Sequence, residues 1–108
     1  MVIFRQGDIV EVTFDPTRGH EPKKTRPALV VSNDTFNEST SMPIVCPITT
    51  VDNGFFLHEP LPAGHDVYGF IAMEQSRTMD LNARRAEVID RLNEKEMRPV
   101  LSCLKSFF

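Results

Sequence analysis

Short runs of apolar residues, separated by polar turns, predict that this chain is rich in β-strands. Asp8–Phe14 is rich in apolar and β-branched residues and ends at Asp15 and Pro16, because proline cannot donate to a strand ladder. Arg26–Ser32 is a second run of the same kind. Met42–Ile48 is apolar at positions that face both sides of a sheet, so we expect this third strand to be central.

The middle of the chain predicts a short helix and further strands. Asn33–Ser39 is expected to form the helix, with Asn33 or Asp34 as its N-cap. Asp52–Gly54 has the composition of a hairpin turn. The expected elements after it are, in chain order, a strand at Phe55–His58, a loop at Glu59–Asp66, a long strand at Val67–Glu74, a turn of helix within Met79–Arg85 and an edge strand at Ala86–Ile89.

From Asn93 onward the chain has the spacing of an amphipathic helix. Asn93 and Glu96 stand at the two positions of a capping box. Pro99 removes one backbone hydrogen bond and disfavours helical geometry at Arg98, so we expect a kink or a regular helix that begins at about residues 98–99. The apolar face of this helix is predicted to consist of Met97, Val100, Leu101, Leu104 and Phe108.

Several short strands and one terminal helix predict a mainly β fold with α, a small and strongly twisted β-barrel of SH3-like architecture. The length of 108 residues and an apolar content of 41% fit one domain, residues 1–108, with a single modest core. No apolar run has the roughly 20 residues that a membrane helix needs, and the N-terminus lacks the apolar region of a signal peptide. We therefore expect a cytoplasmic protein with no membrane partner.

The cysteines and histidines do not predict a metal site. Cys46 and Cys103 lack metal-type spacing, and we expect both to be buried thiols in a reducing compartment. His20, His58 and His65 are too widely spread to indicate a zinc site. Metal-free chemistry without a cofactor is the expectation.

The formal net charge of −3 argues against a protein that holds duplex nucleic acid by bulk electrostatics. The cations are nevertheless clustered, which suits contact with a few phosphates rather than many. One cluster lies in the loop before the second strand and the other follows the last long strand. These clusters are Arg18, Lys23, Lys24 and Arg26, and then Arg77, Arg84 and Arg85.

The loop between the first two strands carries most of the candidate chemistry. Arg26 is always protonated and can offer a fork of donors to a phosphate, unless it only forms a surface ion pair with Glu21. His20 can act as a general acid or base, and Glu21 can align or deprotonate a hydroxyl. Solvated surface side chains are the alternative for both. Loops on a rigid scaffold are common sites of binding and catalysis.

Polar residues also follow the third strand and the last long strand. Thr49 and Thr50 can donate to a phosphate oxygen, although threonine is also common in strands for packing reasons. Gln75 can read a base edge, and Arg77 can reach a phosphate or pair with Asp80.

Two phenylalanines beside the predicted hairpin turn are either core residues or a platform on which an unpaired base stacks. With them, the predicted RNA-binding set is Arg18, Lys23, Lys24, Thr50, Phe55, Phe56, Gln75 and Arg77.

The chain resembles the MazF/PemK family of toxins in four blocks that occur in the family's order. These blocks are GDIVEVTFDPTRGHE, TRPALVVSN, VCPITTVDNG and GFIAMEQSRTMDL, and a C-terminal helix follows them. The resemblance implies a homodimeric SH3-like endoribonuclease toxin, or mRNA interferase, that cuts single-stranded RNA at short sequences without a metal. It implies products with a 2′,3′-cyclic phosphate and a 5′-hydroxyl. It also implies neutralisation by a cognate antitoxin and operator DNA binding by the toxin–antitoxin complex.

The same resemblance assigns roles to five residues. Arg26 and Thr49 fall on the catalytic arginine and threonine of the MazF-like branch, and Glu21 falls on its supporting loop glutamate. His20 falls on a histidine implicated in the PemK-like branch. Glu74 stands where that branch has an aspartate acting as base.

Two departures from the family pattern leave the identity of the base open between Glu21, His20 and Glu74. Ala72 replaces an arginine of the PemK-like branch, so its acid–base scheme does not transfer whole. Pro22 replaces the usual glutamine after the loop glutamate. Two other functions fit the same architecture: a non-catalytic SH3-like binding module and a toxin that poisons gyrase.

Overall fold

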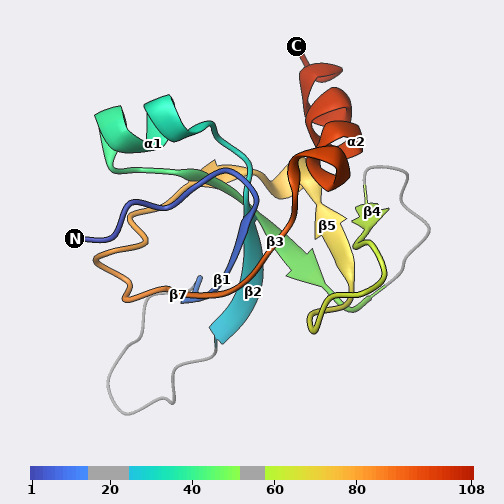
Figure 1. The fold of residues 1–108 in the computed structure, drawn as a ribbon, viewed down its shortest axis with the longest axis horizontal. Helices are drawn as coiled ribbons and strands as arrows, with labels where there is room; N and C mark the ends of the chain where they lie inside the picture. The colour runs from blue at the N-terminus through green and yellow to red at the C-terminus, as the bar shows by residue number, and fades with distance from the viewer. Residues whose placement is uncertain (15–24, 52–57) are drawn as a thin grey trace.

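The computed structural model describes residues 1–14, 25–51 and 58–108. Figure 1 shows α1 and α2 on either side of the central strands, with the C-terminus at the far end of α2. The elements are, in chain order, β1 (Asp8–Thr13), β2 (Thr25–Val30), α1 (Asp34–Thr40), β3 (Ile44–Thr49), β4 (His58–Pro60), β5 (Phe70–Ala72), a 3₁₀ turn (Met73–Gln75), β6 (Arg77–Thr78), β7 (Glu87–Arg91) and α2 (Glu94–Lys105).

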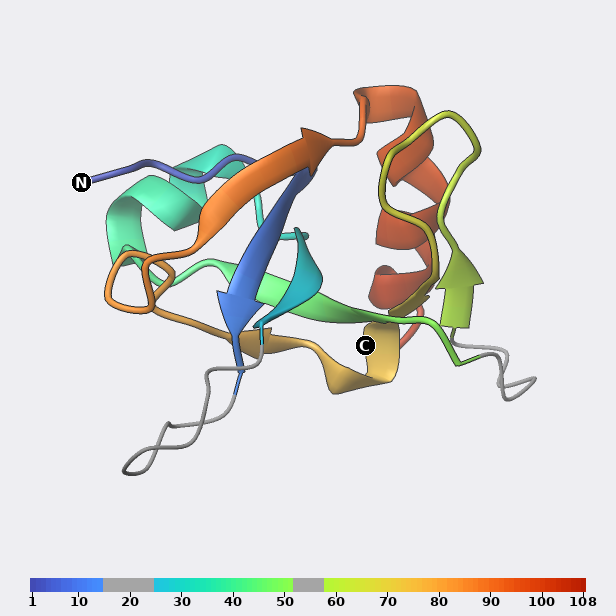
Figure 2. The same ribbon diagram turned by 90° about the horizontal axis from the view of Figure 1, so that it is seen from below.

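One antiparallel sheet with the strand order β4-β5-β3-β2-β1-β7 organises the molecule, and β6 pairs with β3 beside this path. The sheet curves strongly, so that β7, β1, β2 and β3 surround an interior (Figure 2). Within the described residues β4 and β7 remain the two ends of the path, and the barrel is not closed. The predicted mainly β fold with a C-terminal helix is confirmed, as are the central position of β3 and the edge position of β7.

The strands bury residues on both faces, because alternate side chains of β1, β2 and β3 enter two different cores. The first core lies under α2 and the second lies on the other face of the sheet. The first contains Ile9, Leu29, Cys46, Ile48, Ile71, Met73, Met97 and Val100 among others. The second contains Phe4, Val10, Val12, Ala28, Val30, Val45, Met79 and Leu81.

The segment after β3 differs from the prediction. The described strand β4 covers His58–Pro60, so the loop predicted from Glu59 is wrong there, while residues 55–57 lie outside the described residues. The long strand predicted at Val67–Glu74 is also wrong. Only three residues form β5, because Gly69 has a φ of +146° and a 3₁₀ turn begins at Met73.

The region from β6 to β7 departs from expectation in one respect, the strand β6. The turn of helix predicted within residues 79–85 is present as a single turn, in which the amide of Arg84 donates to the carbonyl of Asp80 at 3.1 Å, and no regular helix follows because the turns end at Arg85 with a φ of +54°. The two residues of β6, which pair with Ile44 and Val45 of β3, were not predicted as a strand.

The C-terminal helix begins earlier than its proline suggested. Asn93 and Glu96 form a reciprocal capping box, as predicted, and α2 begins at Glu94 and continues through Pro99. The expectation that the regular helix begins at residues 98–99 is therefore wrong, because the cap and the burial of Met97 and Val100 offset the bond that proline removes. The assignment of Phe108 to the apolar face is also wrong, since it lies beyond the helix and is fully exposed.

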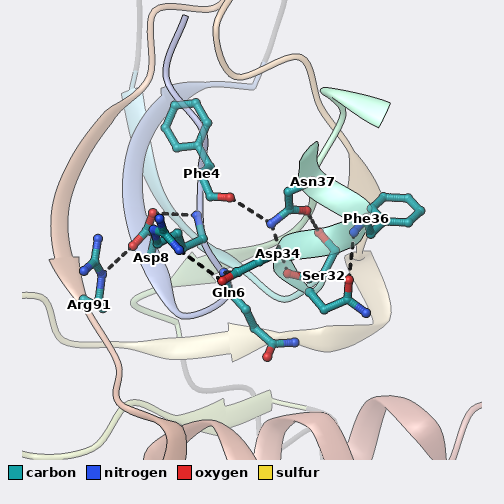
Figure 3. A network of polar contacts seen from close by, with 10 residues as sticks. Phe4, Gln6, Asp8, Ser32, Asp34, Phe36, Asn37 and Arg91 are labelled. Carbon is teal, nitrogen blue, oxygen red and sulfur yellow. Dashed lines mark hydrogen bonds and ion pairs between the residues drawn. The ribbon is translucent and has the colours of Figure 1, made fainter. Parts of the chain in front are cut away.

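Buried polar groups join the N-terminal segment to α1 and β7 (Figure 3). The amide of Asn37 donates to the carbonyls of Phe4 and Ser32 at 3.0 and 3.1 Å, and its Oδ1 accepts from the Ser32 hydroxyl. Asp8 is buried, and its carboxylate accepts from Nε of Arg91 at 2.7 Å. These partners satisfy polar groups that would otherwise destabilise the fold.

Both cysteines are free thiols, as predicted, but the expectation that both are buried is correct only for Cys46. Cys46 is buried and Cys103 is partly buried. Burial is the main cause that raises the pKa of Cys46 to about 12, with the charge of Glu74 as a further contribution. Neither helix of the described ranges is long and apolar enough to cross a membrane.

His65 fastens the segment between β4 and β5 to the rest of the domain. Its Nδ1 lies 3.0 Å from Oδ2 of Asp90 in β7, and its Nε2 lies 2.8 Å from Oε2 of Glu96 in α2. The hydrogen bond with Glu96, and then that with Asp90, raises the pKa of His65. The pKa of Asp90 is lowered mainly by the backbone amide of Arg91 and further by His65. The pKa of Glu96 is lowered mainly by the backbone amide of Asn93 and further by His65.

We predict that His65 stabilises the fold most in mildly acidic solution. Because its pKa is raised in the folded state, its contribution is fully present below its ordinary pKa of 6.5 and is lost as the pH rises through the raised value. Urea unfolding of His65→Gln and the unchanged protein at about pH 5.5 and about pH 9 measures this, since both carboxylates stay ionised at these pH values. A difference in unfolding free energy that grows toward high pH would contradict the prediction.

Candidate active site

The register of the central strands brings two predicted catalytic residues together. β2 and β3 pair through Ala28↔Pro47, Leu29↔Cys46 and Val30↔Val45. Carried two residues further, the same register sets Arg26 opposite Thr49. Residues at corresponding positions of an antiparallel pair project from the same face of the sheet, so both side chains lie on one face just beyond the last pair, Ala28↔Pro47.

Their common face is the one that carries the second core, on the side of the sheet away from α2. Arg26 shares this face with Ala28, and Thr49 shares it with Val45. Arg26 is exposed and Thr49 is half-buried, so the core ends where these two polar side chains begin. The amide of Val51 donates to Oγ1 of Thr49 at 3.2 Å, which leaves the hydroxyl hydrogen able to donate to a ligand.

Proline and glycine determine how the end of β3 is held. Pro47 lies where β3 changes its outer partner from β6 to β5, a place where a missing backbone donor is tolerated. Thr49 then pairs with Phe70 of β5, and Gly69 packs directly on the Thr49 carbonyl. A Cβ built on Gly69 would lie 2.6 Å from that carbonyl oxygen, so only glycine fits here.

Two arginines lie close to the end of β1 on the same side of the sheet. Nη1 of Arg84 donates to the carbonyls of Thr13 at 2.6 Å and Phe14 at 3.0 Å. Nη2 of Arg77 donates to the Phe14 carbonyl at 3.4 Å, and its guanidinium lies 5.4 Å from the centre of the Phe14 ring. The two guanidinium groups therefore lie close together, because both donate to the carbonyl oxygen of Phe14.

These arginines are not neutralised within the described parts of the chain. None of the three arginines (Arg26, Arg77 and Arg84) forms an ion pair with another described residue. The alternative predicted from the sequence, an ion pair between Arg77 and Asp80, is therefore not present. Uncompensated guanidinium groups beside an exposed face attract an anion such as a phosphate.

Glu74 lies in the 3₁₀ turn that follows β5. Its Oε2 is 2.9 Å from Nε2 of His58, the first residue of β4. Two other predicted RNA-binding residues, Thr50 and Gln75, are exposed.

The remaining predicted site residues lie outside the described residues: Arg18, His20, Glu21, Lys23 and Lys24 before β2, and Phe55 and Phe56 before β4. Their assignments stay predictions. Among residues 1–14, 25–51 and 58–108, no group of three or more histidine, cysteine or acidic side chains is arranged to hold a metal ion.

Sequence reasoning missed two side chains beside the site. The sequence assigns Arg84 to a cationic cluster but does not predict where it lies, because its hydrogen-bond partner Phe14 is 70 residues away in the chain. His58 was considered only as a zinc ligand, and its contact with Glu74 depends on the pairing of β4 with β5. Neither contact has a local signal in the sequence.

Comparison with known proteins shows the family to which this chain belongs. Residues 5–108 match the model of a family described as PemK-like, MazF-like toxin of type II toxin–antitoxin system. Endoribonuclease PemK of Escherichia coli is 36% identical over 106 residues, which cover 94% of this chain and 79% of that protein. Endoribonuclease toxin ChpB of Escherichia coli K12 is 45% identical over 92 residues, covering 80% of this chain and 78% of that protein.

Solved structures show the same fold. The crystal structure of MazE–MazF (Form-II) from Deinococcus radiodurans matches with a TM-score of 0.86 and 31% identity, over 99% of this chain and 96% of that chain. MazF (Form-I) from the same organism matches with a TM-score of 0.82 and 31% identity, over 99% of this chain and 97% of that chain. The predicted fold class is confirmed by these neighbours, although the sheet described here is not closed.

We predict that Gly69→Ala destabilises the protein by about 3 kcal/mol, because it combines an unfavourable φ with a clash against the Thr49 backbone. Gly64→Ala is the matched control: Gly64 has a φ of +94° but open space around it, so only strain of about 1 kcal/mol is expected. Urea unfolding measures both variants. Equal losses of unfolding free energy would mean that the contact with Thr49 is not tight.

Proposed function

The chain belongs to the PemK-like, MazF-like toxin family of type II toxin–antitoxin systems, and from this premise we propose that it cleaves single-stranded RNA with Arg26 and Thr49 at the scissile phosphate. Its curated relatives are named endoribonucleases, and its enzyme class is the same. One solved neighbour is a MazE–MazF complex, which supports an antitoxin as a partner of this toxin as well.

The observation that carries the proposal is the β2–β3 register, which ends at Ala28↔Pro47 and, when continued for two residues, sets Arg26 opposite Thr49. A guanidinium can bind two oxygens of one phosphate, and the threonine hydroxyl can donate to a third. In the transition state of RNA cleavage the phosphorus carries an additional oxygen and more negative charge. Donors fixed on two paired strands stabilise that charge without reorganising.

The chemistry proposed is attack by the ribose itself. The 2′-oxygen forms a bond to phosphorus as a base takes its proton, and the bond from phosphorus to the 5′-oxygen breaks. The 5′-oxygen gains a proton from His20 or Arg26, and the products are a 2′,3′-cyclic phosphate and a 5′-hydroxyl. Arg26 serves mainly through its charge, since an arginine rarely releases a proton. Glu21, His20 and Glu74 are the candidate bases.

Arg77 and Arg84 fit contacts with phosphates next to the scissile one. They lie on the side of the sheet that carries Arg26, and neither has a carboxylate partner in the part of the chain that the structure describes. Contacts of this kind position a strand without reading its sequence. Sequence preference then depends on residues such as Gln75 and on the two segments at 15–24 and 52–57.

The remaining parts of the proposal concern assembly. We expect a homodimer in the cytoplasm, with the half-buried face of α2 as part of its interface. The antitoxin is expected to cover the basic face with an acidic and apolar segment, and the complex to bind operator DNA. The cleavage step is proposed to need neither a metal nor a cofactor.

We predict that Arg26→Ala lowers kcat for RNA cleavage by about 10²–10³-fold, the usual effect of removing one donor to a transition-state oxyanion. Cleavage of a long transcript with mapping of the product ends measures this. Arg5→Ala is the matched control, because Arg5 is an exposed arginine that pairs with Asp34 near the other end of β2.

Unchanged cleavage by a folded Arg26→Ala protein would refute the catalytic role of Arg26. Binding of RNA without shortened products would instead favour a non-catalytic module. Gyrase inhibition with intact RNA would favour the other toxin class.

We predict that a 2′-deoxy nucleotide at the cleavage site abolishes cleavage at that site, because the nucleophile is missing. The same oligonucleotide with the deoxy nucleotide several positions away is the control. EDTA is expected to leave the rate unchanged. Cleavage of the deoxy substrate, or strong inhibition by EDTA, would contradict the proposed mechanism.

A further inference from the structure

The contact between His58 and Glu74 joins the two elements that flank β5. Nε2 of His58 lies 2.9 Å from Oε2 of Glu74, and the two side chains are 6% and 28% exposed. An ionised carboxylate can only accept a hydrogen bond, so Nε2 is the donor. Among the described residues nothing donates to the second oxygen of Glu74, Oε1. A buried ring therefore fixes one oxygen of an accessible carboxylate and leaves the other for a ligand.

Strand pairing relates this contact to Thr49. His58 pairs with Ala72 of β5, and the β3–β5 register, carried one residue further, sets Ala72 opposite Pro47. His58 therefore projects from the same face as Pro47, and Thr49 lies two residues along β3 on that face. His58 and Thr49 are two strands apart across the sheet and two residues apart along the strand direction. Their Cα atoms are therefore separated by about 12 Å. Because Oε2 of Glu74 lies 2.9 Å from Nε2 of His58, the carboxylate lies beside the face of the sheet that carries Thr49.

We infer that His58 is a positioning residue for RNA cleavage: it holds Glu74 so that Oε1 takes the proton of the ribose 2′-hydroxyl. This inference rests on the proposed function and selects Glu74 from the three candidate bases. Bond changes are those of the proposed reaction, with the proton of the 2′-hydroxyl passing to Oε1 as the bond from the 2′-oxygen to phosphorus forms.

The physical reason is that a base must be held within hydrogen-bond distance of the proton that it takes. Glu74 sits on a short 3₁₀ turn with a flexible side chain, and within the described residues His58 provides its one polar contact. A displacement of about 1 Å in a reacting group can lower a rate about 10²-fold. His65 also contacts carboxylates, but it faces β7 and α2 and serves the fold.

The test measures kcat and KM for a short single-stranded RNA with His58→Phe and His58→Gln. Phenylalanine fills the buried site but donates nothing, and we expect kcat to fall about 10–100-fold with KM unchanged. Glutamine keeps an N–H donor, and we expect it to retain most of the rate. If His58→Phe does not fold, His58→Asn replaces it, because its shorter amide cannot reach Glu74.

A double-mutant cycle with Glu74→Gln separates positioning from general structural damage. If His58 acts through Glu74, then His58→Phe has no further effect on kcat in the Glu74→Gln protein. His65→Gln, assayed at a temperature where circular dichroism shows it folded, is the control and is expected to keep its kcat within about twofold. The inference would be overturned if His58→Phe left kcat unchanged. It would also be overturned if the loss of kcat in the double variant equalled the product of the losses in the two single variants. The proposed function would survive either result, because it depends on Arg26→Ala losing cleavage.

Discussion

The pairing register of β2 against β3 is the constraint on which the site depends. Both strands are buried on both faces, with Leu29 and Cys46 in one core and Val30 and Val45 in the other. A slip of one residue would exchange these faces for every side chain of a strand. The same pairs that fix the two cores therefore fix Arg26 and Thr49 on one face, and no separate interaction between the two residues is needed.

Charge is distributed in keeping with that arrangement. Away from the candidate site, Arg91 pairs with Asp8, and His65 contacts two carboxylates. On the face beyond the second core, Arg26, Arg77 and Arg84 lack a carboxylate partner among the described residues, although the net charge of the whole chain is −3. A local excess of cations on an acidic protein suits contact with a few phosphates and disfavours general binding to nucleic acid.

Local patterns in the sequence were sufficient for much of the fold. Apolar, β-branched runs predicted β1 and β2, and the pair Asn93 and Glu96 predicted the start of α2. Pro99 led to a wrong placement of the regular part of that helix. The segment from β4 to β6 was predicted poorly, because its strands are two or three residues long and depend on Gly69 and on partners in β3. The candidate site shows the same difference: Arg26 and Thr49 lie in strands with clear patterns, whereas the contacts of Arg84 and His58 cross long stretches of sequence.

The most direct test of the account is whether Arg26 and Thr49 act on one phosphate. The measurement is kcat for RNA cleavage by Arg26→Ala, by Thr49→Val and by the protein carrying both substitutions. If both donors stabilise the same transition state, the double variant loses much less kcat than the product of the two single losses. The account predicts that result, and strictly multiplicative effects of the two substitutions would contradict it.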